Sequence, residues 1–122
     1  MSKSLIILEK YLQFCATFPP ETLKKTMNGA GPSGKGNLVK DTLFYKFNVT
    51  EAANVHDFLY SKYGPKEILR KDADDMFLKM MLSKLKSHSV FSQFLNKPLV
   101  YAYYTSVRLF GGSFWTKEKI DW

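Results

Sequence analysis

Two helix-forming segments on either side of Gly64-Pro65 constrain the fold of this chain more than any other feature. Residues 50–60 have helical spacing behind Thr50, a residue type that caps helix N-termini. After a second cap at Asp72, an apolar face recurs at helical intervals, formed by Ala73, Phe77, Met80 or Met81, and Leu85. Both helices are long enough to pack against each other. The sequence therefore predicts an antiparallel helix pair at the centre of a mostly α-helical domain.

Shorter elements are expected on both sides of this pair. Apolar residues at three- and four-residue intervals predict a first helix that ends before Pro19-Pro20, formed by Leu5, Leu8, Tyr11, Leu12 and Cys15. A second short helix is expected to start at Pro20 or Glu21. Residues 27–37 contain four glycines, which predicts a large glycine-rich loop ahead of the pair.

The remaining segments have weaker signals. Alternating apolar residues between Thr42 and Val49 suggest a brief strand. Pro98 is expected to separate two short helices, because proline interrupts helical hydrogen bonding. The tail from Lys117 to Trp122 is expected to lie on the surface.

Length and composition indicate one compact domain spanning residues 1–122. The chain is 45% hydrophobic, which is enough to enclose a modest core. Cys15 is its only cysteine, so no intrachain disulfide can form and packing must hold the fold, with a bound metal as a further means. We expect neither a signal peptide nor a membrane span, because the apolar stretches are short and the longer one, roughly residues 99–110, is broken by Arg108.

The formal net charge of +7 favours anionic partners, either phospholipid headgroups or nucleic acid. Charge alone does not choose between them, and no recognised nucleic-acid-binding motif is present, so no specific nucleic-acid partner is predicted. The C-terminal aromatic residues are expected mainly in the core. An interfacial membrane patch is the alternative for three of them beside two lysines, namely Phe114, Trp115 and Trp122 with Lys117 and Lys119. The oligomeric state is not predicted.

A group of polar residues on the helix pair indicates hydrolytic chemistry. His56 and Tyr60 are four residues apart and share one helix face, while Asp57 is turned about 100° away. In an antiparallel pair, Asp74 near the start of the next helix can contact the His56 ring and accept from the Tyr60 hydroxyl. An imidazole held in this way can take a proton from water. The pattern predicts the general base of a hydrolase.

Ester hydrolysis also requires stabilisation of negative charge on the carbonyl oxygen, which a hard divalent cation provides. Calcium binds carboxylates, main-chain carbonyls and water. Asp57 is the candidate carboxylate ligand. Gly34 and Gly36 lie in a loop that can turn main-chain carbonyls inward, because glycine permits such conformations. These residues are the candidate calcium site.

At these positions the chain resembles the phospholipase A2 superfamily. Residues 56–60 match its H-D-x-x-Y helix, and the order of motifs is similar to that of the parvovirus capsid-type domain. That domain has a G-x-G-N-like calcium loop, an alanine-rich approach to H-D-x-x-Y and a following A-D-x-x-F helix, here residues 34–37, 51–55 and 73–77. The resemblance spans about residues 31–85.

The resemblance implies calcium-dependent hydrolysis of the sn-2 ester of phospholipids at a membrane surface. By analogy, His56 activates water, Asp74 orients His56, and Tyr60 supports Asp74. Calcium would be held by Asp57 and the loop glycines Gly34 and Gly36. The chain departs from secreted phospholipases because it lacks their disulfide-forming cysteines and the tyrosine that often precedes the calcium loop.

Other interpretations remain open. The chain is also similar to small phage proteins of unassigned activity, which share the helix pair and an aromatic, glycine-containing segment like residues 107–112. A non-enzymatic virion or phage accessory protein would keep His56, Tyr60 and Asp74 as a buried hydrogen-bond network. A basic nucleic-acid-binding domain is the third possibility. His88, near a helix end, is expected to be solvated and is given no catalytic role.

Overall fold

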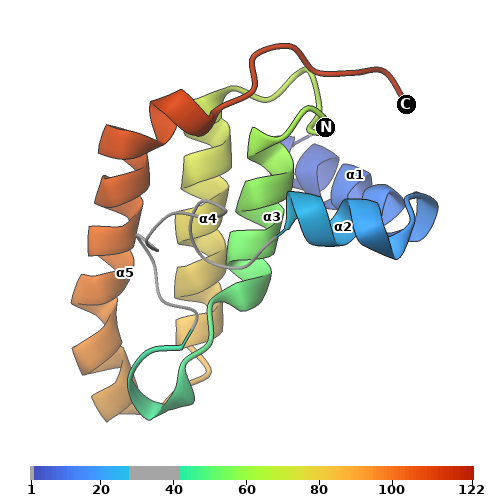
Figure 1. Ribbon diagram of the computed structural model, residues 1–122. Helices are drawn as coiled ribbons and strands as arrows, with labels where there is room; N and C mark the ends of the chain where they lie inside the picture. Colours follow the sequence, from blue (N-terminus) through green and yellow to red (C-terminus); the bar gives the residue numbers. More distant parts are fainter. Residues whose placement is uncertain (1, 28–41) are drawn as a thin grey trace.

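The computed structural model describes residues 2–27 and 42–122 of a mostly helical domain (Figure 1). The elements in chain order are α1 (Lys3–Thr17), α2 (Pro20–Thr26), the 3₁₀ turn η1 (Phe44–Lys46), α3 (Thr50–Tyr60), α4 (Arg70–Leu85), α5 (Val90–Phe110) and η2 (Gly111–Phe114). The predicted mostly α fold is confirmed. The predicted glycine-rich loop, with Gly34 and Gly36, lies outside the described residues.

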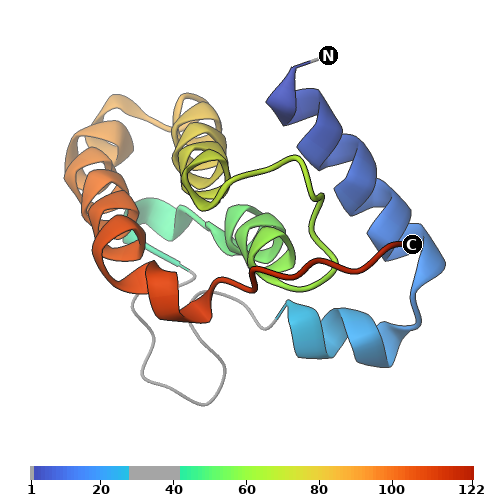
Figure 2. The same cartoon turned by 90° about the horizontal axis from the view of Figure 1, so that it is seen from above.

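The pair α3 and α4 forms the centre of the domain, as predicted. The two helices run in opposite directions, and α5 runs back beside α4 (Figure 1). Seen from above, α1 and α5 lie on opposite sides of this pair (Figure 2). The central pair therefore has one side towards α5 and another towards α1.

The core consists of two clusters of buried side chains, one on each side of the pair. The cluster towards α5 contains Phe47, Val49, Ala52, Ala53, Phe77, Met81, Leu85, Val100 and Val107. The cluster towards α1 contains Ile7, Phe14, Val55, Phe58, Leu59, Tyr60, Ile68, Ala73 and Met76. Because α3 and α4 contribute to both clusters, their relative position is fixed by hydrophobic burial from two directions.

The start of each central helix differs from the prediction. Thr50 is the first residue of α3 and not its cap, and the Asn48 side chain accepts a hydrogen bond from the Thr50 N–H at 2.9 Å. Helix α4 begins at Arg70, so Asp72 is also inside the helix, where its carboxylate accepts from the Leu69 N–H at 3.0 Å. The predicted caps Thr50 and Asp72 lie one and three residues past the observed cap positions Val49 and Leu69.

The brief strand predicted between Thr42 and Val49 is also wrong. Within the described part of this segment, one antiparallel bridge joins Thr42 to Asn48 and encloses a tight turn. Tyr45 and Lys46 in this turn have positive φ angles of 55° and 58°. The turn is attached to α5, because the Asn96 side chain donates to the Phe44 carbonyl at 3.0 Å and accepts from its N–H at 3.1 Å.

Pro98 does not separate two helices, as was predicted. It lies within the continuous helix α5, on the exposed side. A proline inside a helix costs about 3 kcal/mol, because its missing N–H leaves the carbonyl four residues earlier without a helical partner. That carbonyl belongs to Phe94 on the exposed side, where water can hydrate it. Burial of Val100 and Val107 on the opposite side of α5 offsets the cost.

The C-terminal segment after η2 crosses the end of α3 and reaches α1. The Thr116 N–H donates to the Tyr60 carbonyl at 2.9 Å, and the Trp122 indole donates to the Tyr63 carbonyl at 2.9 Å. The Trp122 ring contacts Phe18, with ring centroids 5.1 Å apart. The segment lies on the surface as predicted, but its tryptophans pack inward.

Candidate functional site

The central helices bring together the three predicted catalytic side chains. Nε2 of His56 lies 2.7 Å from Oδ1 of Asp74, and the hydroxyl of Tyr60 donates to the same oxygen at 2.6 Å. His56 and Tyr60 share one face of α3, and Asp74 reaches them from the second turn of α4. The predicted contact between these residues is confirmed.

Two arginines that the sequence analysis missed complete this group. Asp74 Oδ2 accepts from Arg108 Nη1 at 2.7 Å and from Arg70 Nη1 at 3.3 Å. We call these five residues, His56, Tyr60, Arg70, Asp74 and Arg108, the Asp74 network. Arg70 was detectable from its position four residues before Asp74, on the same helix face. Arg108 carried no comparable local signal, because it comes from α5.

The Asp74 network joins three helices. Arg70 also donates to the last turn of α5, from Nη1 to the Val107 carbonyl at 2.9 Å and from Nη2 to the Arg108 carbonyl at 3.2 Å. Gly111, just past this turn, comes so close that a Cβ atom there would lie 2.6 Å from the Tyr60 hydroxyl oxygen. The end of α5 therefore closes over the network.

The electrostatics keep Asp74 ionised. Burial by itself raises the pKa of Asp74, but hydrogen bonds from His56 and Tyr60, and one from Arg108, outweigh it and hold that pKa below its ordinary value. An ionised carboxylate only accepts hydrogen bonds, so Nε2 of His56 carries the proton, and Nδ1 of the neutral ring is left as an acceptor. Burial, followed by the hydrogen bond to Asp74, raises the pKa of Tyr60, which keeps it a phenol donor.

The His56 ring is held firmly. Its centroid lies 4.3 Å from that of Tyr60 and 4.8 Å from that of Phe77. His56 is 9% exposed and Asp74 is fully buried. The ring therefore has a fixed orientation and is almost completely enclosed by protein.

Two aspartates near Asp74 in the sequence do not compete with it for His56. Asp72 forms an ion pair with Lys3 at 2.9 Å. Asp75 pairs with Lys71 at 2.7 Å and accepts from the Tyr104 hydroxyl at 2.6 Å. Both carboxylates are thus engaged with partners outside the Asp74 network.

His88 differs from the expectation of a solvated side chain. It is half-buried, with Nδ1 3.1 Å from the Ser92 hydroxyl and its ring packed edge-on against Phe47. These contacts give it a structural role at the junction of α4 and α5.

Of the three residues predicted to bind calcium, only Asp57 lies within the described residues. Asp57 follows His56 on α3 and is half-buried, and its carboxylate oxygens are of the type that calcium prefers. Gly34 and Gly36 lie outside the described residues. Within residues 2–27 and 42–122, no three His, Cys, Asp or Glu side chains are grouped so that they could hold a metal ion.

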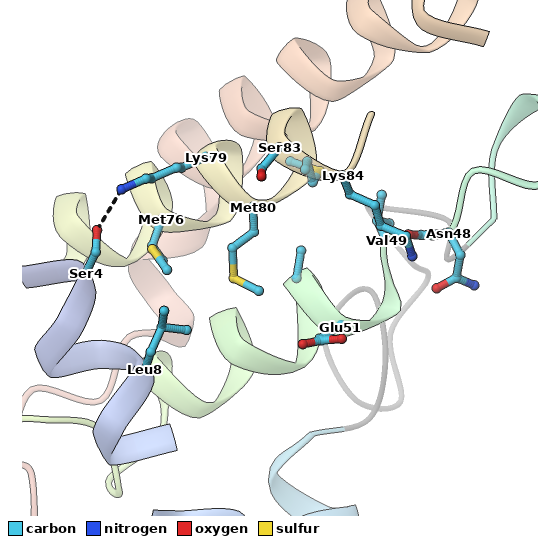
Figure 3. Close-up of a pocket in the computed structure, with 12 residues that line it drawn as sticks. Ser4, Leu8, Asn48, Val49, Glu51, Met76, Lys79, Met80, Ser83 and Lys84 are labelled. Carbon is cyan, nitrogen blue, oxygen red and sulfur yellow. Dashed lines mark hydrogen bonds between the residues drawn. The ribbon is translucent and has the colours of Figure 1, made fainter. Parts of the chain in front are cut away.

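A pocket lies on the side of the central pair that faces α1 (Figure 3). Its volume is about 430 Å³, and α1, α4 and the start of α3 surround it. We call it the methionine pocket; its apolar wall is formed by Leu8, Val49, Ala52, Met76, Met80 and Met81. At its rim, Lys79 donates to the Ser4 hydroxyl at 3.1 Å and Lys84 to the Asn48 carbonyl at 2.6 Å. None of the five network residues lines it.

Comparison with known proteins gives one similarity. A family described as proteins of unknown function (DUF1353) matches residues 37–96, just under half of the chain. The matched part contains α3, α4 and the first third of α5, and so four residues of the Asp74 network but not Arg108. No curated protein and no solved structure matches the chain. The similarity thus concerns the helix pair and carries no assigned activity.

Proposed function

We propose that the chain is a phospholipase A2-like carboxylic ester hydrolase that cleaves the sn-2 ester of phospholipids at a membrane surface, with calcium. The observation that carries the proposal is the hydrogen bond of 2.7 Å between Nε2 of His56 and the ionised carboxylate of Asp74, which also accepts from Tyr60. This arrangement fixes the imidazole tautomer and leaves Nδ1 to accept a proton.

In the proposed reaction, the oxygen of a water molecule forms a bond to the ester carbonyl carbon while its proton passes to Nδ1 of His56. Asp74 stabilises the imidazolium that forms, and Tyr60 keeps the carboxylate in place. The ester C–O bond then breaks and the proton passes to the departing alcohol oxygen. The products are a fatty acid and a lysophospholipid.

Calcium, with Asp57 and the loop glycines Gly34 and Gly36 as its proposed ligands, would supply positive charge for the carbonyl oxygen. Positive charge is also present in the protein itself. Arg70 and Arg108 outnumber the single carboxylate of the Asp74 network, which favours an anionic substrate group on this side of the domain.

The test is fatty acid release from mixed phospholipid vesicles, with calcium or with a chelator. The variant His56→Gln keeps an N–H that can donate to Asp74 but removes the base. We expect it to fold and to lose release by about 100-fold or more. His88→Gln, a histidine outside the Asp74 network, is the matched control and should retain release. Release by His56→Gln at the wild-type rate would contradict the assignment of the base.

A second candidate function is a non-enzymatic accessory protein in which the helix pair is a scaffold. The observation that favours it is that fully buried Asp74 accepts from four donors contributed by three helices. Such a network fixes a fold whether or not it performs chemistry. This alternative predicts no fatty acid release by the wild-type protein under any calcium condition.

A further inference from the structure

Helix α5 carries several large hydrophobic side chains on its exposed side. Large hydrophobic side chains open to solvent recur along it at helical spacing, and we call this surface the outer face of α5: Val90, Phe91, Phe94, Leu95, Tyr101 and Leu109. Phe91 and Phe94 are 71% and 75% exposed. Exposed large apolar side chains gathered on one surface mark an interaction site, so the outer face of α5 is a surface suited to a partner.

The turn η1 adds two exposed aromatic rings beside the first half of this helix. Phe44 and Tyr45 are 53% and 60% exposed. Asn96 fastens the turn to α5 through both the N–H and the carbonyl of Phe44. Tyr45 and Lys46 have left-handed backbone conformations, which are uncommon for residues other than glycine. The fold therefore holds exposed aromatic rings in an unusual turn next to an exposed apolar helix.

The charge around this surface is positive. Helix α5 contains no Asp or Glu, and its charged residues are Lys97 and Arg108. Lys46 in the adjoining turn and Lys97 are both exposed. With a formal net charge of +7 on each molecule, association of two copies is opposed by repulsion, whereas an anionic surface is attracted. Apolar side chains flanked by lysines are the composition that lies in the headgroup region of anionic bilayers.

We propose that the outer face of α5 docks the protein on an anionic phospholipid surface. Among the described residues, none of the helices is both long and apolar enough to cross a bilayer. This inference names the membrane-binding surface for the proposed hydrolase, and the biological purpose of that binding rests on the proposed function. In the patch suggested by the sequence, Trp115 packs on Tyr60 and Trp122 on Phe18, whereas Phe114 is exposed.

The test is co-sedimentation of the full chain with two kinds of vesicle, phosphatidylcholine with phosphatidylglycerol and phosphatidylcholine alone. The double variant Phe91→Ser with Phe94→Ser should bind the anionic vesicles about tenfold or more weakly, because two exposed rings no longer enter the interface. The matched control is Leu5→Ser with Leu12→Ser, two exposed leucines of α1 on the other side of the domain. The control should bind like the wild type.

A single charge change tests the same surface without altering its aromatic residues. Lys97→Glu should weaken binding to anionic vesicles several-fold and leave the weak binding to phosphatidylcholine alone unchanged. Wild-type affinity in both Lys97→Glu and the double phenylalanine variant would overturn the proposal. The proposal would also be overturned if the wild type did not bind vesicles and sedimented as a dimer, while the phenylalanine variant sedimented as a monomer.

Docking and catalysis can fail separately. His56→Gln should bind vesicles as the wild type does while losing fatty acid release, because His56 is not part of the outer face of α5. If the wild type binds anionic vesicles through this face but releases no fatty acid, the proposed hydrolase is wrong and the docking surface stands. If the wild type releases fatty acid and the phenylalanine variant binds vesicles normally, the docking surface is wrong and the proposed hydrolase stands.

Discussion

The two sides of the central helix pair are held together in different ways. Towards α5, the Asp74 network makes directional, charged hydrogen bonds around a carboxylate with no exposure. Towards α1, the same helices leave the methionine pocket, whose wall is apolar and whose rim lysines bond to neutral oxygens. The network depends on the direction and distance of charged hydrogen bonds, whereas the wall of the pocket depends on apolar contacts, which flexible methionine side chains can adjust.

This difference follows from the physical cost of burying each kind of group. A buried carboxylate is tolerated only when charged or polar partners surround it, so every member of the Asp74 network depends on the others. Methionine side chains in the pocket need no charged partner. Removing their contacts lowers stability in proportion to the apolar contact that is lost. The network side is therefore the one suited to holding a catalytic imidazole, and it should respond more sharply to substitution.

The largest effect is expected from Asp74→Ala. This change leaves Arg70, Arg108 and His56 without their shared acceptor, and it should lower the free energy of unfolding by about 3–5 kcal/mol. Urea unfolding followed by circular dichroism measures this. The matched control is Asp75→Ala on the next position of α4, whose carboxylate is half-exposed, and its effect should be about 1 kcal/mol or less. Equal losses in the two variants would show that burial of the carboxylate does not set the size of its contribution.

A smaller effect is expected where α5 ends over the network. Gly111→Ala places a Cβ atom 2.6 Å from the Tyr60 hydroxyl oxygen and 3.2 Å from Arg70 Nη1, so the network must shift. The free energy of unfolding should fall by about 1–3 kcal/mol. Gly112→Ala is the control, because the nearest atom to its added Cβ is 4.0 Å away. Thermal melts that place both variants at the wild-type midpoint would show that this end of α5 moves freely.

The smallest effect is expected in the methionine pocket. Met80→Leu replaces one apolar side chain with another of similar volume and should change the free energy of unfolding by less than about 1.5 kcal/mol. Fatty acid release, if present in the wild type, should be unaltered because none of the network residues lines the pocket. A pronounced loss of release with normal stability would indicate that the substrate reaches this side of the pair.

The part of the site that could be predicted depends on short-range geometry. His56, Tyr60 and Asp74 were placed correctly because helical spacing and an antiparallel pair determine which side chains meet. Helix α3 ends at Tyr60, and Gly64 lies in the short coil after it, where an added Cβ would lie 2.7 Å from the Leu59 carbonyl oxygen. Arg108 was missed because its position depends on the packing of a helix more than thirty residues further along the chain.

The errors in the fold have related causes. Pro98 predicts a helix break when local hydrogen bonding alone is considered. Burial of the opposite side of α5 outweighs this local effect, and the helix continues through Pro98. The alternation from Thr42 to Val49 fits a strand, but it also fits a turn that buries Phe47 and Val49 and exposes Tyr45. In both places contacts with distant parts of the chain determine the structure.

The crossing of the C-terminal segment over α3 gives the molecule a built-in optical signal. This segment carries both tryptophans of the chain, one against Tyr60 beside the Asp74 network and one against Phe18 of the segment that follows α1. Their fluorescence emission therefore reports on two separate contacts without any added label. A disturbance of the network should change the surroundings of Trp115 first, whereas detachment of the segment from α1 should expose Trp122 to water and shift its emission to the red.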